Sequence, residues 1–429
     1  MRRLWADRNA RWYLGGQSFS LFGDTALWLA MGIWVKELTG SSGDAGLTFF
    51  FFGLGAIGSP LAGLVVDRLR RRPLLIWANI AGAGAVLALL AVHGRGQVWL
   101  IWLVALMYGV VYAFLSSAQS ALLVTMLDDD LLVDANGFLR TVREGFRLVA
   151  PLVGAGLFAL IGGGAVAIVD SATFLIAAAA LGFVHVEEEK PQPSEQHWWG
   201  EVTAGATHLW RTLVLRQITM AAAFACLVVG FLEPIAFAVV SQGLHRAPTF
   251  LGVILAVQGI GAVAGGLTSA PVARRIGEGP LCGFGLLLLA IGSGLFMVAN
   301  LVAVFAGAIV LGASLPWLIV GFMTLLQRRT PPELQGRVSA AADTLTSIPQ
   351  TASIAVGAAL LGIVDYRLLL AVVAVVVSAA GVYLLTRREQ WERPATVAAA
   401  SAPAASRAVP AATAVASAAA APGETIETE

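Results

Sequence analysis

Two acidic residues stand inside long apolar stretches of this sequence, where an ionisable side chain needs a function or a bonding partner. Asp24 shares one helix face with Gln17 and Trp28, because the three recur at helical spacing. Glu233 precedes Pro234, which removes a backbone donor and weakens the helix. A charge at mid-membrane costs about 2.5–3.5 kcal/mol. We interpret Asp24 as a proton site or a contact for a substrate cation, and Glu233 as a second proton site. The alternatives are that Asp24 only bonds neighbouring helices and that Glu233 pairs with an arginine at a kink.

Aromatic and amide side chains on other apolar segments predict the wall of a cavity. Tyr108, Tyr112 and Gln119 fall on one helix face, and Gln350 lies on another helix. Such a wall suits a bulky amphipathic solute, although helix packing and an interfacial aromatic belt explain the same pattern. The predicted cavity lining is Gln17, Trp28, Tyr108, Tyr112, Gln119 and Gln350.

Charged residues near the ends of these segments predict a gate. Asp67 sits at a helix C-terminus, where its charge opposes the helix dipole and favours a facing cation. A bond that exists in only one of two conformations biases the equilibrium between them. The predicted gate comprises Asp67, Arg68, Arg71, Arg140, Arg147 and Asp343. The alternative is that the arginines are snorkelling anchors. We interpret Asp170 as structural.

Several kinds of chemistry have no signature in the sequence. There is no phosphate-binding glycine loop, no metal-ligand spacing among the histidines and cysteines, and no nucleophile arrangement in a polar segment. We therefore predict that the chain is not an enzyme and uses no cofactor or metal. The formal net charge of +1 argues against nucleic acid as a partner.

The elements that must position these residues are membrane-spanning helices. The chain is 58% hydrophobic and 12% charged, about half the charge of a soluble domain. Its apolar residues form blocks close to the roughly 20 residues that a spanning helix needs. The predicted spans are 12–36, 46–66, 74–93, 98–123, 138–161, 164–185, 216–241, 249–271, 280–299, 302–326, 338–362 and 367–386.

The placement of arginine predicts orientation and domain organisation. Arginines concentrate at both termini and in alternate loops, which places both termini in the cytoplasm by the positive-inside rule. The predicted parts are a six-helix bundle over 1–185, a central cytoplasmic loop with an interfacial helix over 186–215, a second six-helix bundle over 216–390 and a disordered tail over 391–429. A solvated linker is the alternative for the central loop.

Two pairs of similar segments suggest that the halves are duplicates. The segment from Gly63 matches that from Gly266, and the segment from Gly154 matches that from Gly357. The end of the second span, Gly63-x-x-x-Asp67-Arg68 followed by three arginines, is similar to the signature loop of the major facilitator superfamily. The second copy departs from that pattern, because Ala270 stands where the first has its aspartate.

A second motif resembles one branch of that superfamily. Pro151, Gly154 and Gly156 form a degraded version of the Gly-Pro-x-x-Gly-Gly antiporter motif. With Asp170-x-x-Thr173-Phe174, it resembles the drug/proton antiporters that include macrolide, tetracycline and siderophore exporters. The resemblance implies an all-α membrane protein whose two pseudo-symmetric six-helix bundles rock around a central cavity.

We therefore expect a secondary active transporter in the cytoplasmic (inner) membrane. The hypothesis is proton-coupled efflux of an amphipathic small molecule, such as an antibiotic, siderophore or secondary metabolite. Its partners would be that substrate, protons and the lipid bilayer, and the chain would act as a monomer. The alternatives are a lipid or lysolipid flippase on the same fold and a non-transporting membrane sensor.

Overall fold

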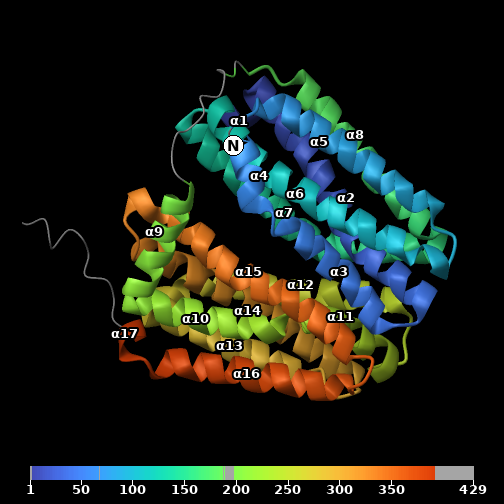
Figure 1. Cartoon of the computed structure of the whole chain (residues 1–429), viewed down its shortest axis with the longest axis vertical. Helices are drawn as coiled ribbons and strands as arrows, with labels where there is room; N and C mark the ends of the chain where they lie inside the picture. Colours follow the sequence, from blue (N-terminus) through green and yellow to red (C-terminus); the bar gives the residue numbers. More distant parts are fainter. Residues whose placement is uncertain (1, 67, 187, 189–197, 392–429) are drawn as a thin grey trace, which may run out of the picture. The chain divides into compact units, whose positions relative to one another are not determined.

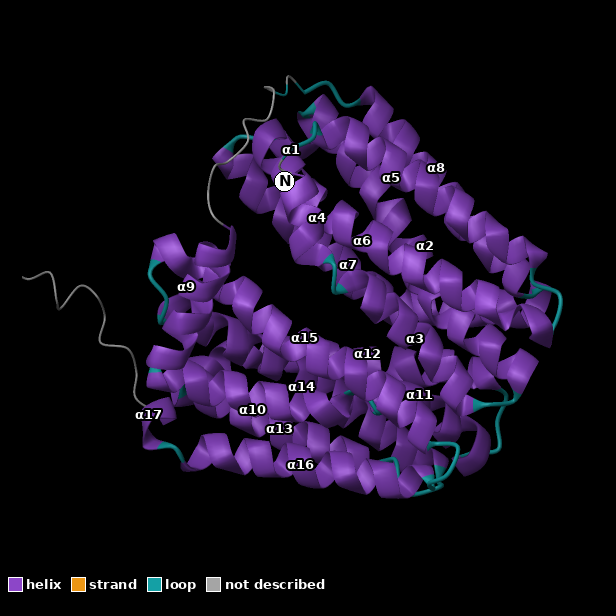
Figure 2. Ribbon diagram, viewed as in Figure 1, coloured by secondary structure: helices purple, strands orange, loops and turns teal. Residues whose placement is uncertain are grey.

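The computed structural model describes residues 2–66, 68–186, 188 and 198–391. The regular structure of these residues is helical, and none of them lies in a β-strand (Figures 1 and 2). Asp67, the stretch 189–197 and the tail from residue 392 lie outside the described residues, so the predictions made for them stay predictions.

The first half of the chain forms helices that pack mainly on one another. α2 packs against α7 and α8, α6 against α3 and α5, and α5 against α8. These helices are α1 (Arg2–Ala6), α2 (Arg8–Thr39), α3 (Ser42–Ala56), α4 (Ser59–Val66), α5 (Arg71–Leu87), α6 (Val98–Met126), α7 (Asp129–Ile161) and α8 (Gly163–Phe183).

The helices of the second half also pack mainly on one another. α14 packs against α12 and α13, α16 against α13 and α10, and α15 against α10 and α9. The helices are α9 (Trp198–Arg211), α10 (Leu213–Val229), α11 (Leu232–Ala238), α12 (Leu251–Ile276), α13 (Glu278–Leu295), α14 (Leu301–Arg328), α15 (Gln335–Leu360), α16 (Tyr366–Thr386) and α17 (Arg388–Trp391). Residues Val239–Gly243 continue α11 as a π-helical turn.

Ten helical segments of the described chain are long and apolar enough to cross a membrane. The predicted spans 46–66 and 338–362 are helical but are not among the ten. The first is divided between α3 and α4 by a turn at Ile57 and Gly58. The second, α15, carries several polar residues, including Asp343, Ser347 and Gln350. With these two, the described residues contain all twelve of the predicted helical segments.

Two glycines join consecutive helices with almost no loop. Gly162 separates α7 from α8 at φ 89°, and Gly277 separates α12 from α13 at φ 95°. Side chains disfavour positive φ, so glycine allows one helix to end and the next to begin within one residue. At each junction, one helix is therefore joined to the next by a single residue.

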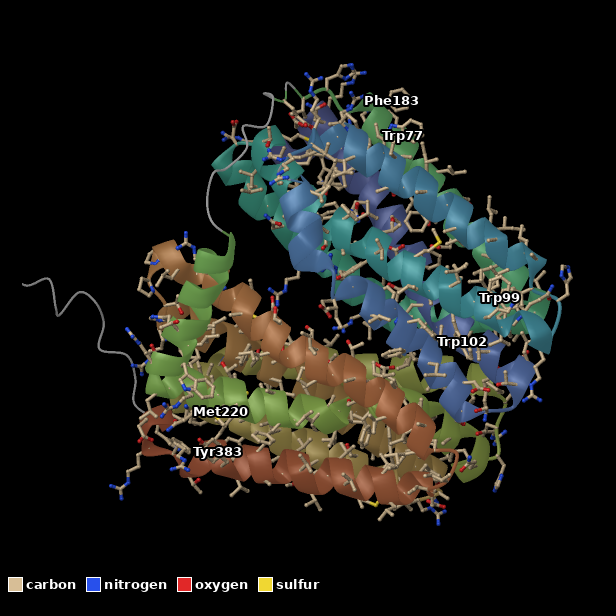
Figure 3. All side chains as sticks on the ribbon, in the orientation of Figure 1. Trp77, Trp99, Trp102, Phe183, Met220 and Tyr383 are labelled. Atoms are coloured by element: carbon tan, nitrogen blue, oxygen red, sulfur yellow. The ribbon has the colours of Figure 1, made fainter. Side chains whose placement is uncertain are left out.

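The outer surface of the first half is aromatic at both ends of its helices. Trp77 lies near the start of α5 and is 68% exposed, and Trp99 lies near the start of α6 and is 58% exposed (Figure 3). Because α5 and α6 run in opposite directions, the two tryptophans stand at opposite ends of the bundle. Exposed tryptophans at both ends are typical of a protein that spans a bilayer.

A short helix is present in the central loop, as predicted. α9 packs on α15, where a Cβ at Gly205 would overlap the backbone of Arg337, and Leu209 is buried. Trp210 points outward and is exposed. Its position in the membrane interface stays a prediction.

Candidate functional site

Asp24 accepts a hydrogen bond from another of the predicted cavity residues. It lies in the middle of α2, and the Tyr108 hydroxyl of α6 donates to its Oδ1 at 2.5 Å. Ser20, one turn earlier on α2, donates a long hydrogen bond of 3.5 Å to its Oδ2. Tyr108 is buried, so this contact joins α2 and α6 inside the first half. The structure thus brings the polar faces of two helices together, a contact that spacing along either helix alone does not predict.

Asp170 lies beside this pair, and the sequence analysis assigned it no functional role. It is 1% exposed in α8, and a Cβ at Gly23 would overlap its Oδ1. The Thr173 hydroxyl approaches Oδ1 at 3.5 Å, whereas Oδ2 has no hydrogen-bond partner among the described residues. The carboxyl group also interacts electrostatically with Asp24 and Tyr108. The sequence signal for Asp170 was an acidic residue within an apolar helix. Only the structure shows that this residue faces Asp24.

A positive charge from α7 acts on the same group. Arg143 is exposed, and its charge attracts the Asp24 carboxylate. One turn further along α7, Arg147 forms an ion pair with Glu144 at 3.6 Å, in which both side chains are about half exposed. The helix therefore presents positive charge along the side that faces the start of α2.

The other predicted cavity residues of the first half fall into two groups. Gln119 donates to the Gln17 side-chain oxygen at 2.7 Å, one level nearer the start of α2 than Asp24. Toward the other end, Trp28 packs on Phe49 with ring centroids 4.4 Å apart. Tyr112 is 46% exposed, and its ring lies 5.7 Å from that of Phe52. Tyr112 thus lies along α6 between Tyr108 and Gln119, whereas the Trp28–Phe49 pair lies on the other side of Asp24.

Glu233 lies at an interrupted helix, as the adjacent proline predicts. α10 ends at Val229 and α11 begins at Leu232, and Gly230 packs tightly against the Gln350 carbonyl of α15. The Glu233 side chain is half buried, and no hydrogen bond or ion pair of that side chain occurs within the described residues. No contact there joins it to Asp24, so the two proposed proton sites remain separate.

The two halves touch at the ends of the helices that lie away from the start of α2. A Cβ at Gly46 of α3 would overlap Pro234 of α11, and the Phe49 and Phe237 rings stack at 6.0 Å. A Cβ at Gly252 of α12 would meet Ala155 Cβ of α7 at 2.7 Å. We call this end of the helices the far side and the opposite end the near side.

Glycines on the near side have open space instead. A Cβ at Gly63, Gly145 or Gly266 would meet nothing within 4 Å. Asp343 and Ser347 of α15 are exposed there. The structure therefore represents a conformation in which the far side is packed and the near side is open.

The predicted gate residues do not meet across the halves within the described residues. Arg68, Arg140 and Asp343 are exposed, and the Arg71 side chain donates to Thr125 within the first half at 2.7 Å. The Glu188 carboxylate caps the start of α5, accepting from the backbone amides of residues 71 and 72 at 2.6 and 2.8 Å. Gating by these residues stays a prediction.

Two members of the antiporter-like motif lie at close helix contacts. A Cβ at Gly154 would meet the Ala26 backbone of α2 at 2.6 Å, and the Pro151 carbonyl faces Gly252. Gly156 has open space around it. The motif thus packs α7 against α2 on one side and near α12 on the other.

Comparison with known proteins identifies the family. The family model described as Major Facilitator Superfamily matches residues 13–240 and 218–421. The chain belongs to the Major Facilitator Superfamily. Similar structures include a bacterial homologue of the iron transporter ferroportin in an inward-facing state, with a TM-score of 0.69 at 16% identity, covering 88% of this chain and 98% of that one. The nucleoside transporter NupG gives a TM-score of 0.72 at 14% identity, covering 87% and 98%.

Two relatives of known name are similar in sequence to part of this chain. Macrolide efflux protein A of Streptococcus pyogenes is 27% identical over 222 residues, 51% of this chain and 53% of that protein. The Enterococcus faecalis protein of the same name is 26% identical over 181 residues, 41% and 54% of the two chains. The chain thus spans about half the length of the curated relatives that it matches. The predicted superfamily and its all-α multi-pass membrane fold are confirmed.

Proposed function

We propose that this chain is a secondary active transporter that exports an amphipathic small molecule in exchange for protons. The similarity to the macrolide efflux proteins carries this proposal, because the names of those relatives state both export and a large amphipathic substrate. The chain performs no catalysis, works as a monomer and lies in the cytoplasmic membrane with both termini in the cytoplasm. The near side then faces the cytoplasm, where the arginines gather.

The predicted cavity residues suit such a substrate. Gln17 and Gln119 offer amide groups, while Trp28 and the exposed Tyr112 offer aromatic surface. Pockets that bind amphipathic molecules combine mostly apolar walls with a few well-placed polar groups. A large, weakly polar substrate would enter from the open near side and reach Asp24 at mid-helix.

Proton exchange is assigned to Asp24, with Glu233 as a second candidate. Tyr108 and Ser20 donate hydrogen bonds to the Asp24 carboxyl group, and the positive charge of Arg143 attracts it, so three residues act on the proposed proton site in this conformation. Asp170 lies behind it, with one carboxyl oxygen that has no hydrogen-bond partner among the described residues, and we assign it a role in holding that side of the site in place. Proton binding at Asp24 would release Tyr108 and loosen the α2–α6 contact.

Alternating access would exchange the packed and open sides. The far-side contacts of Gly46, Phe49 and Gly252 separate, while the near-side gate closes. In that state, Arg140 or Arg147 would approach Asp67 or Asp343 across the halves. An ion pair made in only one state shifts the equilibrium by its differential energy.

The proposal is tested by transport in inside-out vesicles. A pH gradient, acidic inside, is imposed on vesicles that contain the full chain. The uptake of a radiolabelled macrolide into these vesicles is then measured. We expect uptake that collapses with the gradient and is absent from empty vesicles. Uptake that persists without the gradient would refute proton coupling, and no uptake of any amphipathic probe would refute export.

A further inference from the structure

A groove on the outer surface of the second half has the shape of a lipid site. It lies between α9, α10 and α15 and has a volume of about 520 Å³. Its lining includes Leu209 and Trp210 of α9, Met220 and Ala223 of α10, and Leu345 of α15. In Figure 3, Met220 lies near the beginning of α10, beside α9. The groove is therefore mostly apolar and stands at the near end of the helices.

The groove opens onto the surface that faces the bilayer. The exposed residues Leu213, Met220 and Phe224 recur at seven- and four-residue steps along α10, so they form one outward stripe. Met220 of this stripe also lines the groove. Asp343 lies two positions from Leu345 on α15, so it points to the opposite side of that helix. The apolar interior is thus continuous with the surface that lipid chains cover.

Two arginines stand at the rim of the apolar interior. Arg211 is the last residue of α9 and Arg216 lies in the first turn of α10. Neither forms an ion pair within the described residues, and Arg216 makes one long contact of 3.5 Å with the Trp210 carbonyl. Guanidinium groups bind phosphate in a two-pronged manner. A third polar group, the Thr219 hydroxyl, is buried at the groove and has no hydrogen-bond partner in the described chain.

We propose that this groove binds one anionic phospholipid. The arginines at positions 211 and 216 hold its phosphate, and one acyl chain lies along Met220 and Ala223 toward Leu345. Charge complementarity selects this occupant, because the groove combines an apolar floor with two arginines that form no ion pair within the described residues. A neutral amphiphile leaves the cations unmatched, and a free phosphate leaves the apolar floor uncovered.

Binding there would fasten the central-loop helix to the second half. α9 contacts α15 at Gly205 and passes into α10 through Thr212 alone. A lipid in the groove touches all three helices at once, so it stabilises their present arrangement. The near ends of α10 and α15 flank the open side, so the bound lipid would lie beside it.

Native mass spectrometry of the purified full chain tests the proposal. The probes are phosphatidylglycerol and phosphatidylcholine with identical acyl chains, and inorganic phosphate as competitor. We expect one phosphatidylglycerol to be retained more tightly than phosphatidylcholine. The double variant Arg211→Gln/Arg216→Gln should lose about fivefold in affinity per arginine. The matched control Arg95→Gln/Arg246→Gln removes two exposed charges on the far side and should bind as the unchanged chain does.

A second variant tests the apolar floor of the groove independently of the two arginines. Ala223→Trp fills the apolar floor while both arginines remain, and it should displace the lipid without lowering the thermal stability of the lipid-free chain. Equal retention of the two lipids, or equal retention by the two arginine double variants, overturns the proposal. So does competition by inorganic phosphate as strong as that by phosphatidylglycerol, because it would mean that the arginines bind an anion without the groove.

Discussion

Gly252 is the position where a single added methyl group most directly tests alternating access. The residue lies at the far-side start of α12, and an alanine Cβ would stand 2.7 Å from Ala155 Cβ and 2.9 Å from the Pro151 carbonyl of α7. Both distances are too short for normal contact, and the backbone carbonyl cannot turn away. Overpacking of this kind costs about 1–3 kcal/mol. The cost applies only while α7 and α12 touch, so Gly252→Ala should shift the equilibrium about 5- to 150-fold away from this conformation.

Cysteine accessibility measures that shift. Ser347 is exposed on the near side of α15, so Ser347→Cys reports whether that side is open. The two native cysteines, Cys226 and Cys282, are first replaced by alanine. Labelling by a membrane-impermeant maleimide from the near side should slow in Gly252→Ala, since the near side closes when the far side opens.

The matched control lies on the same helix. A Cβ at Gly266 of α12 would meet nothing within 4 Å, so Gly266→Ala has the same effect on helix propensity without the collision. It should label at the rate of the parent protein. Equal labelling of Gly252→Ala and Gly266→Ala, with both variants folded, would show that the α7–α12 contact does not distinguish two transport states.

Three further predictions concern stability and substrate binding. Glu188→Ala removes the two hydrogen bonds that cap α5 and should lower the free energy of unfolding, measured by thermal denaturation, by about 1–2 kcal/mol. The control Asp128→Ala changes an N-cap residue that makes no side-chain hydrogen bond there, so it should change the free energy of unfolding little. Arg328→Ala leaves the buried Glu278 carboxylate without the guanidinium that lies 2.6 Å from it, and should lower the free energy of unfolding by about 1–3 kcal/mol. The double variant with Glu278→Gln should recover part of this loss. No recovery would contradict the pairing. Trp28→Ala removes a ring stacked in the cavity and should weaken binding of a fluorescent amphipathic probe by about tenfold, with an unchanged dissociation constant counting against that cavity wall.

Hydropathy predicted the helices well because bilayer thickness sets a length that apolar blocks must satisfy. Its weakest points were the two segments where polar or turn-forming residues interrupt the block. The chain divides α3 from α4 at Ile57 and Gly58, and α15 carries Asp343 and Gln350. Such interruptions reduce the apolar signal while the helix remains, since a helix satisfies its own backbone groups and Asp343 of α15 is exposed on the open near side.

The candidate site was less accessible to sequence reasoning. Helical spacing placed Asp24 beside Ser20 and grouped Tyr108 with Gln119, because one helix fixes its own faces. It could not show that Tyr108 bonds Asp24 or that Asp170 lies against Gly23, since those contacts depend on how three helices pack. The near-side gate stays a prediction, because the predicted gate residues do not meet across the halves within the described residues.

Substrate-induced proton release tests the central claim most directly. The full chain is purified in weakly buffered detergent solution with a pH-sensitive dye, and a saturating macrolide is added at several starting pH values. Proton-coupled export through Asp24 predicts a release of protons that is present in the unchanged chain, lost in Asp24→Asn and retained in Ser171→Ala, a buried hydroxyl on α8 that bonds the Ala83 carbonyl instead. Equal release from Asp24→Asn and the unchanged chain, with substrate binding intact in both, would contradict it.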